Sequence, residues 1–216
     1  MSKFTAASIA GLGGAAGIGG GVYLLNKDSE NKSISKPEKE TIQSRLQKEK
    51  FQILTSDASQ WSEIKTQYNS KKDDASKVFA ISNSEVQESV LKDLCRENLS
   101  KSEFDDSLYS KVKRWCVVPT TISSHLKLWG ITSLPTDESK EEQKDKWEEL
   151  AKKYDAASNK IKDLNSLSDE KWKSLRTKCK SMGEKKNYED DFDSFFESSK
   201  IWCASDGSNS PSSVNG

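Results

Sequence analysis

The sequence has few histidines and prolines, and each of these two shortages restricts the structures and functions that the chain can have. The chain has one histidine, His125, so any chemistry that uses a histidine as base or in a nucleophilic triad depends on this residue. One histidine and the lack of a Cys-x-x-Cys pair also argue against a zinc site. The low proline count, Pro 4, suits a helical protein, since proline interrupts helices.

Several patterns that mark well-known site types are also missing. The glycines are concentrated in an apolar N-terminal stretch, which is the wrong context for a phosphate-binding loop, so no nucleotide or other cofactor is expected. The formal net charge is +0 and no basic stripe stands out, which argues against a nucleic-acid partner. No segment alternates at period two for long, so strands are not expected.

Residues 4–25 form the one long uncharged stretch. A helix of about 22 residues, rising ~1.5 Å per residue, crosses a hydrocarbon core of ~30 Å. We therefore expect a single-pass transmembrane anchor that binds the membrane through residues 4–25. Lys3 lies before the stretch, while the charges of Lys27, Asp28 and Glu30 nearly cancel after it, which predicts a cytoplasmic N-terminus and an extracellular bulk. A cleaved signal peptide is the alternative, although no small-x-small cleavage site follows the stretch.

The stretch carries glycine at every fourth position, at Gly13, Gly17 and Gly21. Small residues at this spacing let two membrane helices approach closely, which makes self-association through the anchor one interpretation. The other is that glycine and alanine simply keep the anchor modestly hydrophobic.

The remainder of the chain contains an internal duplication. Similar blocks occur in the same order in both halves, at an offset of about 80 to 87 residues, which is longer than a solenoid repeat. The clearest paired positions are Thr41 and Thr121, Trp61 and Trp147, Tyr68 and Tyr154, Cys95 and Cys179, and Trp115 and Trp202. The predicted organisation is a basic start (1–3), the anchor (4–25), a linker (26–36), repeat 1 (37–116), repeat 2 (117–203) and a disordered tail (204–216).

Each repeat is predicted to be a helical bundle, so the fold class is all-α. A capping box of Ser35 and Glu38 predicts the start of the first helix, and residues 84–99 are expected to form another. Residues 137–146 are a charge run and are expected to be an exposed insertion. The tryptophans and tyrosines stand at helical spacing and are expected in the core. On the helix of residues 84–99, the expected apolar face comprises Val86, Val90, Leu91, Leu94 and Cys95.

The four cysteines are Cys95, Cys116, Cys179 and Cys203. Three connectivities are open to four cysteines, and the economical one outside the cell joins Cys95 to Cys116 and Cys179 to Cys203. Each such bridge would stabilise by roughly 3 kcal/mol on the loop-entropy model. A bridge from Cys116 to Cys203 would instead join the two copies. If no disulfide forms, the four reduced cysteines would pack in the core as small apolar residues.

His125 is not expected to be catalytic, because it aligns with Arg45 and that position therefore accepts an exposed base. The pairs Asp105–Asp106 and Asp190–Asp191 lie near expected helix N-termini, where the helix dipole favours negative charge. This local role is a simpler explanation than paired-carboxylate catalysis.

The glycine-rich start, the Thr-Ile-x-Ser and Trp-x-Glu-[Ile/Leu]-x-x-x-Tyr blocks, the Leu-[Lys/Arg]-x-x-Cys block and the Trp-Cys endings resemble the large paralogous families of haemotropic mycoplasmas. The resemblance covers nearly the whole chain and implies a surface protein involved in antigenic variation or contact with a host surface protein. It implies no catalytic or binding residues. We expect a membrane-anchored surface protein that is not an enzyme; the alternatives are a carboxylate-based hydrolase and a structural membrane protein facing the cytoplasm.

Overall fold

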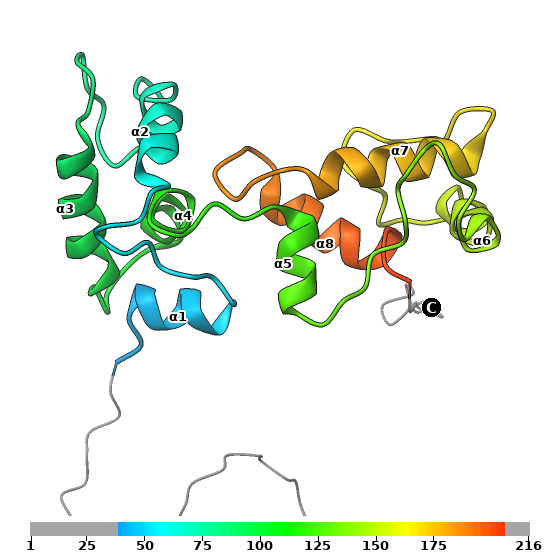
Figure 1. Cartoon of the computed structure of the whole chain (residues 1–216), viewed down its shortest axis with the longest axis horizontal. Helices are drawn as coiled ribbons and strands as arrows, with labels where there is room; N and C mark the ends of the chain where they lie inside the picture. The colour runs from blue at the N-terminus through cyan, green and yellow to red at the C-terminus, as the bar shows by residue number, and fades with distance from the viewer. Residues whose placement is uncertain (1–38, 206–216) are drawn as a thin grey trace, which may run out of the picture. The chain divides into compact units, whose positions relative to one another are not determined.

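The computed structural model describes residues 39–205, which belong to the compact unit Lys39–Gly216 (Figure 1). This part of the chain is all-α, with eight helices and no strand. The helices are α1 (Ile42–Lys48), α2 (Trp61–Asn69), α3 (Glu88–Leu99), α4 (Asp106–Trp115), α5 (Ile122–Leu128), α6 (Lys144–Tyr154), α7 (Lys171–Gly183) and α8 (Phe192–Trp202). The first four lie in the first half of the described part (39–116) and the others in the second half (117–205).

The expected membrane anchor, with Gly13, Gly17 and Gly21, lies outside the described residues. Within residues 39–205 no helix has both the length and the apolar character needed to cross a membrane.

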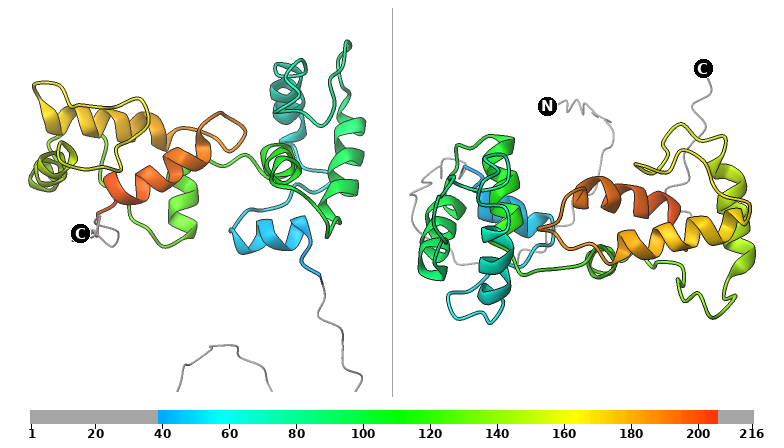
Figure 2. Two further views of the ribbon diagram at one scale, coloured as in Figure 1. Left: turned by 180° about the vertical axis from the view of Figure 1, so that it is seen from behind. Right: turned by 90° about the horizontal axis from the view of Figure 1, so that it is seen from above.

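The two halves pack their helices in the same pairs. In the first half α1 contacts α3 and α4, while α3 contacts α2 and α4. In the second half α5 contacts α7 and α8, while α7 contacts α6 and α8, and α7 and α8 run side by side (Figures 1 and 2).

The first helix of each half begins and ends in the same way. Thr41 and Thr121 are the N-caps, and their side chains accept hydrogen bonds from the backbone N–H groups of Ser44 and Ser124. At the other end the backbone turns left-handed at Lys50 (φ 66°) and Gly130 (φ 73°). The following residue then donates back into the last turn, Phe51 N to Leu46 O at 2.9 Å and Ile131 N to Leu126 O at 3.0 Å. This is a Schellman ending, which satisfies carbonyls that the helix leaves open.

The tryptophans and tyrosines that the sequence places in the core are buried there. Trp61, Tyr68 and Trp115 of the first half, like Trp147, Tyr154 and Trp202 of the second, are at most 2% exposed. Each indole N–H donates to a backbone carbonyl: Trp61 to Thr55, Trp115 to Lys77, Trp147 to Pro135 and Trp202 to Asn159. Since a buried N–H without a partner is costly, these bonds fix loop segments against the helices.

Aromatic packing and backbone bonds also correspond between the halves. Tyr68 and Trp115 meet edge to face with ring centroids 5.2 Å apart, and Tyr154 and Trp202 do so at 4.8 Å. The loop after the first helix of each half pairs with the end of its last helix: Leu54 N donates to Cys116 O at 3.0 Å, and Leu134 N to Cys203 O at 2.8 Å.

Three local predictions differ from the structure. The first described helix begins at Ile42 with Thr41 as its cap, and residues 39–41 are not helical, so no continuous helix leads to it from the expected capping box of Ser35 and Glu38, which lies outside the described residues. Helix α3 begins at Glu88, because residues 84–87 are non-helical and Asn69 bonds both backbone groups of Val86. Val90 is 48% exposed, because it lies at the solvent edge of the apolar face of α3.

Candidate functional site

The four cysteines form two disulfides, one in each half. Cys95 is joined to Cys116 with Cα atoms 5.4 Å apart, and Cys179 to Cys203 at 5.7 Å. This is the connectivity within each repeat that the sequence favoured. The bridges tie α3 to the end of α4 and α7 to the end of α8, and all four cysteines are at most 4% exposed. They are therefore part of the core of each half.

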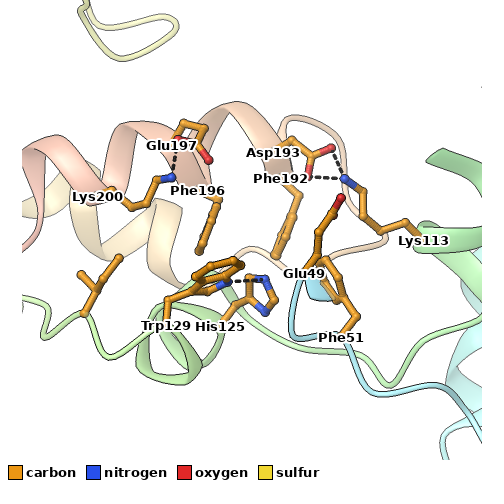
Figure 3. A pocket seen from close by; sticks show the side chains of 11 residues that line it. Glu49, Phe51, Lys113, His125, Trp129, Phe192, Asp193, Phe196, Glu197 and Lys200 are labelled. Atoms are coloured by element: carbon orange, nitrogen blue, oxygen red, sulfur yellow. Dashed lines mark hydrogen bonds and ion pairs between the residues drawn. The ribbon is translucent and has the colours of Figure 1, made fainter. Parts of the chain in front are cut away.

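A second group of residues encloses a cavity of about 520 Å³, which we call the aromatic cavity (Figure 3). Five rings line it: Phe51, His125, Trp129, Phe192 and Phe196. They come from the segment after α1, from α5 and the residue that ends it, and from α8. The cavity thus combines residues of both halves of the described part.

Histidine 125 is the buried centre of this group. It is 2% exposed, its ring stacks on Phe51 with centroids 4.2 Å apart, and the Phe196 ring lies 4.9 Å away. The indole N–H of Trp129 donates to Nε2 of His125 at 3.3 Å, so the proton of the neutral imidazole resides on Nδ1. Burial, followed by the positive charge of Lys113, lowers the pKa of His125 to about 4. The imidazole is therefore uncharged near neutral pH.

The expectation that this position carries an exposed base is wrong. Arg45 in the first half has a side chain that is 37% exposed, whereas His125 is covered by Phe51, Phe196 and the indole of Trp129. The signal available in the sequence was the spacing. His125 and Trp129 are four residues apart on one helix face, as are Phe192 and Phe196, and such pairs are neighbours in space.

The charged residues around the aromatic cavity are held in ion pairs. Lys113 donates to both carboxylate oxygens of Asp193, at 2.8 and 2.7 Å, and the Lys113 side chain is 14% exposed. Lys200 pairs with Glu197 one turn earlier on α8, and Glu49 accepts from Arg45 at 3.4 Å. The edge of the cavity therefore presents neutralised pairs.

Next to the aromatic cavity, a loop of the second half between α7 and α8 bonds to the first half at Lys113, which lines the cavity. Asn187 is 5% exposed; its amide donates to Lys113 O and its carbonyl accepts from the Thr120 backbone N–H. The Tyr188 hydroxyl and the Lys186 ammonium both donate to one oxygen of Glu63, at 2.5 and 2.6 Å.

These bonds displace the pKa values of the groups involved. Burial raises the pKa of Tyr188 to about 12, with Glu63 adding to the effect. Burial alone would raise the pKa of Glu63, but the bonds from Lys186 and Tyr188 outweigh it and lower that pKa.

The acidic pairs that the sequence assigns to helix N-termini behave differently from one another. Asp105 is the N-cap of α4 and accepts from the Leu108 N–H at 2.7 Å, as expected. Asp190 instead accepts from Lys77 at 2.8 Å and Arg114 at 3.2 Å, so its main role is to join the two halves. The bond from Lys77 is the leading cause that lowers the pKa of Asp190.

In residues 39–205 no group of three histidine, cysteine or acidic side chains is arranged to hold a metal ion. Compared with known proteins, the chain matches no family model, no curated sequence and no solved structure. The disulfides and the aromatic cavity are therefore interpreted from their own chemistry.

Proposed function

We propose that this protein is a membrane-anchored surface protein whose extracellular domain is an interaction module made of two copies of one helical unit. The observation that carries the proposal is the pair of disulfides, because they join all four cysteines of the chain. Structural disulfides persist in oxidising surroundings and are rare in the cytosol. They support an extracellular domain over a structural protein that faces the cytoplasm.

The orientation follows from the sequence before the domain. The uncharged stretch of residues 4–25 with Lys3 on its N-terminal side favours a single-pass anchor with a cytoplasmic N-terminus. Such an anchor places the disulfide-bonded domain outside the cell, in agreement with the redox argument.

The two-copy organisation is supported by details that local sequence similarity does not require. Each half has a threonine-capped first helix with a Schellman ending, two indoles bonded to loop carbonyls, an edge-to-face Tyr–Trp pair and one disulfide. The helix pairs that touch are also the same in both halves. Duplication of one unit best explains why the two halves agree in all these features.

Binding is better supported than catalysis. A carboxylate-based hydrolase needs one carboxyl group with a raised pKa to act as general acid. In residues 39–205 the carboxyl groups with displaced pKa values all have them lowered, as ion-paired or hydrogen-bonded carboxylates do. The buried histidine has its Nε2 engaged by an indole N–H. The resemblance to paralogous families of haemotropic mycoplasmas adds a host-contact or antigenic role.

Intact cells provide the test. Extraction with carbonate should leave the chain in the membrane fraction, and external protease should remove the domain of residues 39–205. A membrane-impermeant maleimide should label the domain only after reduction of the disulfides. Protection from protease on intact cells would contradict the proposed location, and labelling without reduction would contradict the two disulfides that support it. Release of a shortened soluble chain would instead identify residues 4–25 as a cleaved signal.

A further inference from the structure

We propose that the aromatic cavity is a binding site for an uncharged planar aromatic group, supplied by a small molecule or by a side chain of a partner. The proposal rests on the proposed function as an interaction module and specifies what that module recognises. It is carried by three observations: an open cavity that the fold does not require, charges at its edge that are already paired, and walls made of aromatic rings.

The first half shows that the fold does not require the cavity. The positions equivalent to His125 and Phe196 are Arg45 and Tyr109, by the same alignment that pairs the disulfides. There the guanidinium lies 3.9 Å from the centre of the Tyr109 ring and also bonds Glu49, so the arginine covers its tyrosine. In the second half the long cation is replaced by a flat neutral ring, and a cavity of about 520 Å³ adjoins it.

The charges argue for an uncharged ligand. Lys113 holds both oxygens of Asp193, and Lys200 is paired with Glu197, so an anion or a cation would have to compete with an existing partner. The imidazole of His125 is neutral and its Nε2 accepts from Trp129. A charged group entering the cavity would therefore lose its hydration without finding a free counter-charge.

The walls argue for an aromatic ligand. Phe192 and Phe196 present parallel rings, with centroids 6.4 Å apart and 4° between their planes, and His125 is tilted 56° from Phe196. Ring pairs favour offset-stacked and edge-to-face arrangements, both of which this geometry offers to a flat guest. Trp129 lies at the edge of the cavity and is 46% exposed, so its indole has free surface against which a guest can pack (Figure 3). The volume lies within the range of small-molecule sites.

The test uses the full chain in lipid nanodiscs, with empty nanodiscs as the control for partitioning into lipid. Three probes share one ring and differ in charge: indole is neutral, tryptamine is a cation and indole-3-acetate is an anion. Ligand-observed NMR titration should give saturable binding of indole, and binding of each charged probe at least about fivefold weaker. Absence of saturable indole binding would overturn the proposal. Tighter binding of tryptamine than of indole would overturn it as well, since the site would then select cations.

Matched variants link binding to the cavity. Phe196→Leu removes a ring from its wall, whereas Phe195→Leu removes the neighbouring ring of α8, which is 7% exposed and does not line the cavity. We expect Phe196→Leu to weaken indole binding by roughly 3- to 10-fold, the size of one lost ring contact, and Phe195→Leu to leave it unchanged. Equal binding by both variants would contradict the assignment, and circular dichroism verifies that each variant is folded.

A second pair addresses the edge of the cavity. Trp129→Ala removes the exposed indole, and Leu128→Ala removes the adjacent side chain, which is 57% exposed and lies outside the cavity. Only Trp129→Ala should weaken indole binding. An equal loss in both variants would show that indole adheres to the exposed apolar surface, and would overturn the proposal.

One further probe identifies the source of the ring. A capped Gly-Trp-Gly peptide that binds at least as tightly as indole would support a partner's side chain. Binding of indole alone would support a small molecule. The result is separable from the proposed location: a chain that is exposed on cells but does not bind indole refutes only this inference, and a protease-protected chain that binds indole refutes only the location.

Discussion

Reduction of the two disulfides should cost the two halves nearly the same free energy of unfolding. The bridges close segments with sequence separations of 21 and 24 residues. On the loop-entropy model these lengths correspond to about 3.3 and about 3.4 kcal/mol. Each value is a large part of the ~5–15 kcal/mol that stabilises a typical domain. Loss of both bridges should therefore leave the domain largely unfolded at 37 °C.

The perturbation is best made as two double variants, Cys95→Ala with Cys116→Ala, and Cys179→Ala with Cys203→Ala. All four positions are at most 4% exposed, so alanine avoids burying a hydroxyl in the core. Urea unfolding followed by tryptophan fluorescence gives the free energy for each variant and for the native chain. Chemical reduction of the native chain provides the control, since it opens the bridges without removing sulfur atoms.

The expected result is a loss of about 3 kcal/mol for either double variant, and a larger loss for the fully reduced chain. Peptide mapping without reductant should recover Cys95 with Cys116 and Cys179 with Cys203. A loss below about 1 kcal/mol in both variants would refute the claim that the bridges constrain the unfolded chain. Recovery of Cys116 linked to Cys203 would refute the connectivity on which the calculation depends.

Four other substitutions have defined outcomes. Both Lys50 and Gly130 have positive φ, which glycine tolerates better than other residues. Lys50→Gly should therefore increase the free energy of unfolding by roughly 0.5–1 kcal/mol, and Gly130→Ala should decrease it by a similar amount; the midpoint of urea unfolding measures both. The depressed pKa of His125 means that the unfolded chain binds a proton before the folded chain does, so the native chain should lose at most about 3 kcal/mol of stability as the pH falls from 6.5 towards 4. The variant His125→Phe should not show this loss in unfolding experiments over the same pH range. Glu63→Gln should cost about 1 kcal/mol in thermal unfolding, allowing for solvent screening, since it weakens the bonds from Lys186 and Tyr188.

The parts of the fold that the sequence predicted are those with a local signal. Trp61 and Tyr68 have helical spacing, and an aromatic stripe of this kind must be buried, as it is. The pairing of Cys95 with Cys116 was accessible for a related reason: each cysteine lies late in a helix, and the two helices are consecutive. Val90 shows the limit of such arguments, because the edge of an apolar face depends on which neighbour covers it.

The parts that the sequence did not predict depend on contacts between distant segments. Nothing in the residues around Asn187 indicates that its side chain bonds to Lys113 and Thr120, about 70 positions earlier. The burial of His125 likewise depends on Phe51 and Phe196, which belong to different halves of the described part. Alignment with Arg45 was misleading here, because the two aligned positions have different neighbours in the folded chain.

That difference bears on the proposed function. The two halves have the same framework of threonine caps, indole–carbonyl bonds and disulfides. A position outside this framework can carry different side chains in the two halves. In the first half the Arg45 side chain covers the Tyr109 ring, whereas in the second half His125 lies beside Phe196 and the aromatic cavity adjoins them. A cavity lowers stability through lost contacts, which agrees with the proposal that the aromatic cavity holds a ligand.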